Sequence, residues 1–221
     1  MTLLALAEHF NGRESKRGDG VVREEGWHND LYGQLARAGA AQVNPLAAGL
    51  LETLDDHRFT TLRESFLDDL HLSPGESTLE VGCGPGMLLE PIHARTGPDG
   101  VIIGLDLNPH FIAVAKQRAE MLAIRSARFE VADCHTLPFP DGTFDAVVAE
   151  KLLMHVAPIA RVISEMARVL AVGGRMVLVD YDPYSAFAAG PNPTITSRIL
   201  ASAAAVYASP QAARETARAC V

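Results

Sequence analysis

The 221-residue sequence contains only three cysteines, which stand far apart at Cys83, Cys134 and Cys220. An odd number of widely spaced cysteines provides neither a disulfide framework nor a Cys-x-x-Cys metal site, so the sequence indicates a reducing, cytoplasmic setting. No apolar run approaches the roughly 18 residues that a membrane-spanning helix needs. The N-terminus has a short apolar patch without a preceding basic region, which does not fit a secretory signal.

Basic residues are also scarce, because 19 Lys and Arg stand against 27 Asp and Glu, for a formal net charge of -8. Phosphate backbones are bound by clustered Lys and Arg, so this balance disfavours a nucleic-acid partner. The hydrophobic share of 48% and the charged share of 21% are ordinary for a globular protein. The length fits one domain with a small extension.

The first third of the chain is expected to form an arm followed by a helical cap. Residues 11–30 are polar and rich in glycine, which favours a loop or lid, with Trp27 as a candidate anchor of the arm. Asn44-Pro45 is typical of a helix start, with Asn as the N-cap and Pro at the first helical position. Apolar residues at helical spacing in 59–70 predict a second helix.

From Ser73 onward, short apolar runs alternate with helical periodicity. Strands are expected at 78–81, 101–105, 127–132, 144–149 and 175–179. Helices are expected from Met87, from Asn108-Pro109 and over 159–170, with Gly173-Gly174 ending the last one; a further helix before Phe144 stays open. This alternation predicts an α/β fold with a doubly wound, Rossmann-like, mostly parallel sheet, in which ligands bind at the carboxyl ends of the strands.

The domain organisation expected from these patterns has three parts. Residues 1–71 form the N-terminal arm and helical cap, residues 72–182 form the α/β core that carries the ligand site, and residues 183–221 form a C-terminal helical segment. The last segment is rich in alanine and follows a Pro- and Gly-containing loop. We expect it to act as a cap.

The segment from Leu79 to Met87 reads LEVGCGPGM and lies between an expected strand and helix. Glycines there allow a ligand to approach the backbone closely. Asp106 ends the next strand, 20 residues beyond Gly86, where a carboxylate can accept hydrogen bonds from a ribose diol. The dinucleotide pattern requires a glycine where Met87 stands, the phosphate-loop pattern requires Gly-Lys, and Pro85 has no N–H for a pyrophosphate.

From about Leu72 to Asp182 the sequence resembles the class I S-adenosylmethionine-dependent methyltransferases. The blocks LEVGCGPG, GLDLNP, ADCHTLPFPDGTFDAVVAE and EMARVLAVGGRMVLVD follow one another in the family's order. The sequence is most similar to the small-molecule group that includes ubiquinone and menaquinone methyltransferases and natural-product tailoring enzymes. The resemblance implies S-adenosylmethionine as cofactor, S-adenosylhomocysteine as product, a small-molecule acceptor and a place in secondary metabolism.

The resemblance also implies the residues that contact the cofactor. In this sequence they are Glu80, Gly82, Cys83, Gly84, Gly86, Asp106, Leu107, Asp133, Cys134, Glu150 and Lys151. The backbone of the glycine turn would face the methionine and ribose portions. Asp106 would hold the ribose hydroxyls, and Asp133 would accept from the adenine amino group. The alternative for both carboxylates is a helix cap.

The remaining contacts follow from the same resemblance. Glu80 would orient the loop or reach the methionine ammonium, and Leu107 would pack on the adenine. Cys134 would offer its backbone N–H to the adenine. Glu150 and Lys151 would lie beside the methionine end.

Methyl transfer from a sulfonium is an in-line displacement that depends on alignment and the exclusion of water, and it requires no metal. A base helps only when the acceptor carries a proton to remove. His155 is the candidate base, with a structural histidine as the alternative. Asp180 and Tyr181 are candidates for the acceptor pocket. His57 and Arg58 reach the cofactor carboxylate or are surface charges.

The acceptor is only weakly constrained by the sequence. The fourth-strand segment AEKLLMH lacks the (D/N)PP(Y/F) pattern of amino-methylating DNA enzymes, which again disfavours nucleic acid. Three other functions remain open: a cyclase-type enzyme that keeps the cofactor structurally, a nicotinamide oxidoreductase, and a cofactor-binding pseudo-enzyme. The absence of a Tyr-x-x-x-Lys pair disfavours the oxidoreductase.

After Val179 the sequence contains no convincing strand, whereas the family usually adds a helix and an antiparallel strand pair. We therefore expect the C-terminal strand pair to be missing from a truncated chain. The fifth strand would then be an exposed edge that is open to pairing with another chain, so a homodimer is an expected arrangement.

Overall fold

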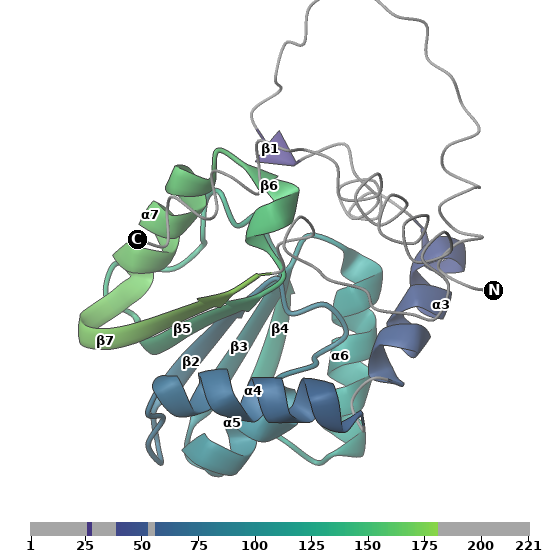
Figure 1. Ribbon diagram of the computed structural model, residues 1–221, viewed down its shortest axis with the longest axis horizontal. Helices are drawn as coiled ribbons and strands as arrows, with labels where there is room; N and C mark the ends of the chain where they lie inside the picture. The colour runs from purple at the N-terminus through teal and green to yellow at the C-terminus, as the bar shows by residue number, and fades with distance from the viewer. Residues whose placement is uncertain (1–25, 28–38, 53–55, 181–221) are drawn as a thin grey trace, which may run out of the picture.

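Residues 26–27, 39–52 and 56–180 are described in the computed structural model of the chain (Figure 1). Their main feature is a five-stranded sheet in the order β4-β3-β2-β5-β7, in which every neighbouring pair is parallel. The strands are β2 (Ser77–Val81), β3 (Val101–Asp106), β4 (Ala127–Val131), β5 (Phe144–Glu150) and β7 (Leu170–Val179). The predicted α/β, Rossmann-like fold is confirmed.

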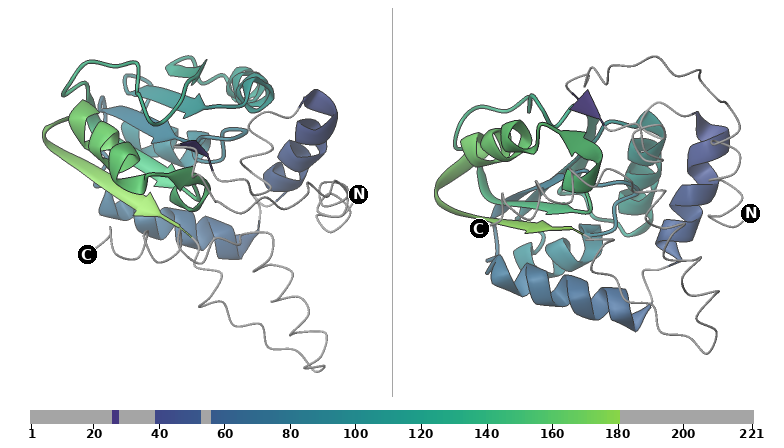
Figure 2. Two further views of the ribbon diagram at one scale, coloured as in Figure 1. Left: turned by 90° about the horizontal axis from the view of Figure 1, so that it is seen from above. Right: turned by 45° about the horizontal axis from the view of Figure 1, so that its top comes forward.

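Helices cover both faces of this sheet. They are α4 (His57–Asp69), α5 (Leu89–Thr96), α6 (Pro109–Met121) and α7 (Ile159–Val169), whereas α3 (Ala40–Leu51) packs against α6. Figure 2 shows α7 on the opposite side of the sheet from α4 and α5. As predicted, Asn108 begins α6, because its side chain accepts the His110 N–H at 2.8 Å.

The two faces of the sheet carry two apolar cores, because alternate residues of each buried strand point to opposite sides. One core joins α4, α5 and α6 to the sheet through residues such as Leu67, Ile92, Ala115, Ile102 and Val148. The other joins α7 to the sheet through residues such as Val162, Met166, Leu79, Leu105 and Val147. Helix α4 falls within the expected cap, but its apolar side packs in the first core.

The start of α3 differs from the sequence prediction. The helix begins at Ala40 after Gly39, and the Val43 N–H already donates to the Gly39 carbonyl at 3.1 Å. Asn44 and Pro45 therefore lie inside the helix instead of starting it. Pro45 is exposed, so the proline ring lies on the solvent side of the helix.

The transition from α7 to β7 also differs from the prediction. The helix ends at Val169 and the strand begins at once with Leu170, so Gly173-Gly174 lies within β7. Pairing with β5 passes from Phe144↔Leu170 to Ala146↔Arg175, and the extra residues of β7 form a bulge in which Gly173 has a φ of 82°. A glycine suits that left-handed conformation.

Residues 132–143, between β4 and β5, contain turns and no helix. Arg168 of α7 stabilises this connection, since its guanidinium donates to the carbonyls of Leu137 and Phe139 at 3.0 and 2.8 Å. The helix that the sequence left open before Phe144 is therefore not present there.

Two short strands join the N-terminal arm to the body. Strand β1 (Gly26–Trp27) pairs antiparallel with β6 (Val156–Ala157), which follows the 3-10 turn Leu153–His155. The backbone of Trp27 thus attaches this part of the arm, whereas the side chain that was predicted to anchor it lies outside the described part of the chain. The predicted C-terminal helices and the proposed truncation lie outside the described residues. No described helix has the length and apolar character required to cross a membrane.

Candidate functional site

A cavity of about 460 Å³ lies at the carboxyl ends of the strands β2, β3, β5 and β7. Helices α3 and α4 contribute to its wall through Leu50, Phe59, Leu62 and Arg63. The strand ends and the segments after them contribute Glu80, Gly82, Cys83, Gly84, Pro85, Met87, Asp106, Leu107, Asn108, Phe111, Glu150, Lys151, Leu152, Met154, His155, Val179 and Asp180. The cavity therefore combines an apolar wall with several carboxylates and two cations.

The glycine turn after β2 is held against β3 by its own backbone. The N–H groups of Gly82 and Cys83 both donate to the Leu105 carbonyl at 2.8 Å, and the Gly84 N–H donates to Asp106 Oδ2 at 2.9 Å. These three N–H groups are therefore bonded within the protein and do not point free to a ligand. They fix the shape of the turn instead.

The glycines of the turn face different surroundings. Each has a left-handed φ, of 77° at Gly82, 51° at Gly84 and 83° at Gly86. A Cβ on Gly82 would lie 3.1 Å from Leu152 Cδ1, and one on Gly86 would lie 3.4 Å from Ala115 of α6. A Cβ on Gly84 would meet nothing within 4 Å. Gly84 thus opens to the cavity, whereas Gly86 packs against α6 and does not line it.

Asp106 connects the glycine turn to the start of α6. One carboxylate oxygen accepts the Gly84 N–H at 2.9 Å, and the other accepts the Asn108 N–H at 2.8 Å. Burial raises the pKa of Asp106 to about 6, although the backbone donors act in the opposite direction. Each carboxylate oxygen can accept two hydrogen bonds, so Asp106 keeps acceptor capacity for a ligand.

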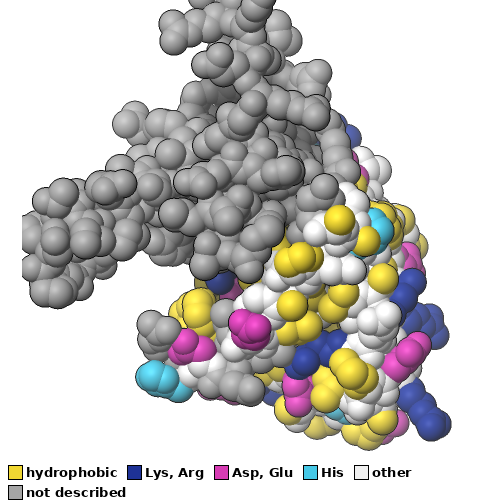
Figure 3. Space-filling model, turned by 90° about the vertical axis from the view of Figure 1, so that its right-hand side faces the viewer, with side chains coloured by type: hydrophobic (Ala, Val, Ile, Leu, Met, Phe, Trp, Pro, Cys, Tyr) yellow, Lys and Arg dark blue, Asp and Glu magenta, His cyan; other side chains and the backbone are white. Residues whose placement is uncertain are grey.

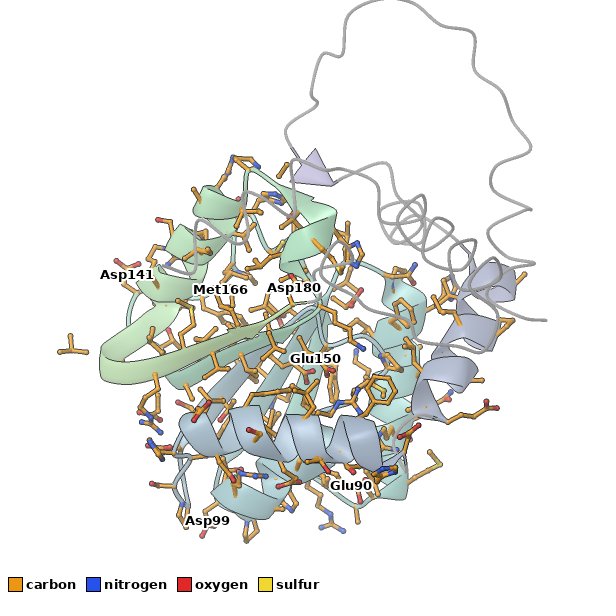
Figure 4. All side chains as sticks on the ribbon, viewed as in Figure 1. Glu90, Asp99, Asp141, Glu150, Met166 and Asp180 are labelled. Atoms are coloured by element: carbon orange, nitrogen blue, oxygen red, sulfur yellow. The ribbon has the colours of Figure 1, made fainter. Side chains whose placement is uncertain are left out.

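Arg63 and Glu150 form a buried, two-point ion pair at the cavity. Arg63 Nε donates to Glu150 Oε2 at 3.0 Å and Nη2 donates to Oε1 at 3.2 Å, with the side chains 6% and 8% exposed (Figure 4). The third guanidinium nitrogen, Nη1, is buried and has no hydrogen-bond partner among the described residues. A charged donor is thus left over beside the cavity.

Glu80 supplies an unpartnered acceptor in the same place. Its side chain lines the cavity, is only 2% exposed, and has a buried Oε2 without a partner among the described residues. Burial raises the pKa of Glu80 well above its usual range, and the nearby Glu150 carboxylate adds to this effect while Arg63 opposes it. A buried carboxylate of this kind gains strongly from a cationic ligand.

Lys151 follows Glu150 with a left-handed φ of 58°, and its N–H donates to the Val179 carbonyl at 2.7 Å. This turn places the Lys151 ammonium 4.8 Å from the centre of the Phe59 ring and 3.9 Å from Glu150 Oε1. The Lys151 side chain is 41% exposed. It therefore contributes positive charge to the wall of the cavity without being fixed by a close ion pair.

His155 lies on the other side of the cavity, in the 3-10 turn after β5. It is 4% exposed, and its backbone N–H donates to the Leu152 carbonyl at 3.0 Å. The neighbouring Met154 N–H donates to Asp180 Oδ2 at 2.9 Å, which connects this turn to the end of β7 (Figure 4). Met154, His155 and Asp180 thus line one wall together.

Asp133 and Cys134 do not line this cavity. Asp133 Oδ1 accepts the His135 backbone N–H at 2.9 Å and lies 2.7 Å from His135 Nδ1. Burial opposes the ionisation of Asp133, but these two contacts outweigh it and lower the pKa. The potential metal-ligand atoms of Asp133, Cys134 and His135 lie within 4.8 Å of one another. Burial raises the pKa of the Cys134 thiol, which disfavours the thiolate that would bind a metal ion. Asp133 and His135 already contact each other, so the three groups make a poor metal site.

Most of the predicted site residues therefore come together. The cavity gathers Glu80, Gly82, Cys83, Gly84, Asp106, Leu107, Glu150, Lys151 and His155, whereas Gly86, Asp133 and Cys134 lie outside its lining. The His57 side chain is 91% exposed and is not among the residues that line the cavity. Burial raises the pKa of the Cys83 thiol well above its usual range, which disfavours the reactive thiolate form.

Arg63 is the main site residue that the sequence argument missed. It lies four residues after Phe59 and three before Phe66, and so shares the apolar side of α4 with them. An arginine on the apolar side of a helix indicates a buried charge, and a buried charge needs a partner. The sequence therefore offered a reason to consider Arg63, although it did not identify the partner.

Comparisons with known proteins agree with this geometry. A family model described as a methyltransferase domain matches residues 79–178. The demethylmenaquinone methyltransferase of Symbiobacterium thermophilum is 31% identical over 166 residues, which cover 74% of this chain and 63% of that protein. The chain spans less than two thirds of the length of the curated relatives that it matches.

Solved structures show the same fold. An S-adenosylmethionine-dependent methyltransferase from Aquifex aeolicus superposes with a TM-score of 0.57 at 20% identity, over 71% of this chain and 87% of the other. A geranyl diphosphate methyltransferase in complex with GPP and sinefungin gives 0.53 at 29% identity, over 65% and 52%. The sequence motifs, the matched methyltransferase domain and the fold are those of the class I S-adenosylmethionine-dependent methyltransferases, a family whose cofactor is S-adenosylmethionine.

Proposed function

We propose that the cavity binds S-adenosylmethionine and that the protein transfers its methyl group to a small-molecule acceptor. The observation that carries this proposal is the pair of unpartnered buried atoms, Glu80 Oε2 and Arg63 Nη1, beside one cavity. An amino-acid group carries one ammonium and one carboxylate, which complement this carboxylate and this guanidinium. A nicotinamide dinucleotide has no such group.

The other residues of the cavity fit the rest of the cofactor. Asp106 would accept from the ribose hydroxyls, and Leu107 would pack against the adenine. Gly84 leaves room for the ligand, since a side chain there would extend into open space. Asp133 and Cys134 lie outside the lining of the cavity, and their contacts with the adenine remain a prediction. Glu150 would hold Arg63 in position, and Lys151 would add positive charge near the methionine end.

When bound, S-adenosylmethionine supplies an electrophilic methyl carbon on its sulfonium. The task of the chain is then to align an acceptor with that carbon and to exclude water. Leu152, Met154 and His155 provide an apolar wall with one imidazole. For a hydroxyl acceptor, His155 would take the proton. The apolar wall and the demethylmenaquinone methyltransferase relative both support a small apolar or aromatic acceptor.

Titration calorimetry with S-adenosylmethionine and with NAD tests the cofactor. We expect binding of the first only, and an Arg63→Met variant that binds it at least about tenfold more weakly because a charged hydrogen bond is lost. Binding of NAD alone would refute the proposal. Transfer of an isotopically labelled methyl group to a panel of phenols, quinones and amines, read by mass spectrometry, then tests the acceptor class.

A further inference from the structure

Strand β4 is one edge of the sheet, and among the described residues no strand lies beyond it. Its exposed residues include Arg128, Glu130 and Val131, the last with 52% of its surface accessible. A parallel edge strand presents unpaired N–H and C=O groups to solvent. Such N–H and C=O groups can pair with a strand of another chain.

The backbone pattern of β4 identifies the groups that point outward. The Ser126 carbonyl accepts from Ile102 and the Ala132 N–H donates to Asp106, so even-numbered residues of this strand direct their backbone groups toward β3. Alternate residues point the opposite way. Ala127, Phe129 and Val131 therefore direct their N–H and C=O groups to the open edge.

The side chains of β4 give this edge a self-complementary charge pattern. Arg128 and Glu130 pair with Ile103 and Leu105 of β3, so both lie on the same face of the sheet, one on each side of Phe129. In an antiparallel pair centred on Phe129, Arg128 of each copy stands opposite Glu130 of the other. Cross-strand pairs of opposite charge are stabilising.

We propose that β4 is a homodimer interface, in which two copies join their sheets antiparallel about a two-fold axis at Phe129. In this register every outward N–H and C=O of Ala127, Phe129 and Val131 finds a partner, and Val131 packs beside Ala127 of the second copy. Arg128 and Glu130 occupy the non-hydrogen-bonded positions, where side chains approach most closely.

Neighbouring registers are less favourable. A two-fold axis at Arg128 puts that residue opposite itself, and an axis at Glu130 does the same with two carboxylates. Like charges directly opposite each other are destabilising. Charge thus selects the register centred on Phe129, and a C2 dimer requires such self-complementarity.

Within the part of the chain that the structure describes, the surroundings of the edge leave space for the second copy. A hollow of about 750 Å³ lies beside β4, between the strand and the end of α6, and includes Lys116, Glu120 and Ile124. Figure 3 shows the side of the molecule that carries α3 and α6, where basic, acidic and apolar side chains are interspersed. The mixed charge on α6, with Lys116 and Glu120 both exposed, is compatible with a second α6 nearby.

Sedimentation velocity of the full chain over a range of concentrations tests the interface. We expect reversible dimerisation, with the dissociation constant raised about tenfold or more in Arg128→Glu and in Glu130→Arg, because each places like charges opposite each other. The double variant Arg128→Glu/Glu130→Arg restores opposite charges and should return to within a few-fold of the wild type. Asp69→Arg, an exposed charge change on α4, should have no effect.

Three results would overturn the proposal: a monomer at all concentrations, a dimer that neither single variant weakens, or a double variant that does not recover. A monomer would mean that the charges of β4 prevent edge pairing instead of directing it. Circular dichroism checks that each variant is folded. Arg128→Gln and Glu130→Gln, which remove charge without reversing it, replace any variant that is not.

Discussion

The Arg63 guanidinium and the Glu150 carboxylate meet through two parallel hydrogen bonds, of 3.0 and 3.2 Å, at the inner end of the cavity. The pair joins helix α4 to the end of strand β5, 87 residues apart in the sequence. Both side chains are almost completely buried. The guanidinium is thereby fixed while one of its nitrogens, Nη1, still lacks a partner.

Removing one member of this pair should cost more stability than removing both. Arg63→Met leaves the buried Glu150 carboxylate with only the half-exposed Lys151 ammonium, 3.9 Å away, which should lower the free energy of unfolding by about 3 kcal/mol. The double variant Arg63→Met/Glu150→Leu should recover most of that loss. Urea denaturation of the two single variants and the double variant measures the coupling. Additive losses would mean that the ion pair contributes nothing of its own.

Two glycines of the turn should separate binding from folding. Gly84→Ala places a methyl group in open space beside the cavity, so it should weaken S-adenosylmethionine binding while costing only about 1–2 kcal/mol of backbone strain. Gly86→Ala has similar strain, but its methyl group meets Ala115, so stability should fall with less effect on affinity. Calorimetry and thermal unfolding distinguish the two. Equal affinity in both variants would exclude Gly84 from the binding surface.

Asp106 should give the protein a pH-dependent stability. A folded-state pKa of about 6, against a usual value of 3.8, means that its contribution is fully present below about pH 4 and is lost as the pH rises toward 6. A difference of roughly two pKa units corresponds to about 3 kcal/mol. The unfolding free energy of the wild type, relative to Asp106→Asn, should therefore fall between pH 4 and 6. A flat difference would show that Asp106 titrates normally.

His155 should affect turnover and leave cofactor binding nearly unchanged. If it takes the proton of a hydroxyl acceptor, His155→Ala should lower kcat by about 10²- to 10⁴-fold. The dissociation constant of S-adenosylmethionine should change little. His155→Gln fills a similar volume without accepting a proton, so it serves as the control for packing. Normal turnover in either variant would leave His155 with a structural role.

The succession of strands along the chain and the location of the cavity at their carboxyl ends could be predicted from the sequence, because apolar runs and glycine turns are local signals. Asp106 was found because it ends a strand at the edge where ligands bind, whereas Glu150 was implied by the resemblance to the methyltransferases. Arg63 was missed because its partner is 87 residues away, and no local pattern predicts such a pairing.

The wrong boundaries have a similar origin. Asn44-Pro45 looked like a helix start, yet tertiary packing of Val43 and Leu46 extends α3 by several residues before it. Gly173-Gly174 looked like a helix end, yet it lies in a bulge of β7 that results from the pairing of this strand with β5. Both residue pairs have local preferences that non-local contacts override.

The buried Glu80 carboxylate should strengthen ligand binding and lower the stability of the unliganded protein. Its folded-state pKa is raised well above 4.5, so its contribution to stability is present below about pH 4.5 and is lost as the pH rises. Glu80→Gln removes the ionisable group and should be more stable than the wild type at pH 7, with the difference shrinking toward pH 4.5.

The same variant should bind S-adenosylmethionine at least about tenfold more weakly, because a charge-assisted hydrogen bond to the ammonium is lost. Glu52→Gln, an exposed position at the end of α3, is the matched control. A Glu80→Gln variant that is less stable at pH 7, or that binds as tightly as the wild type, would show that the buried carboxylate has a structural partner and no role at the ligand.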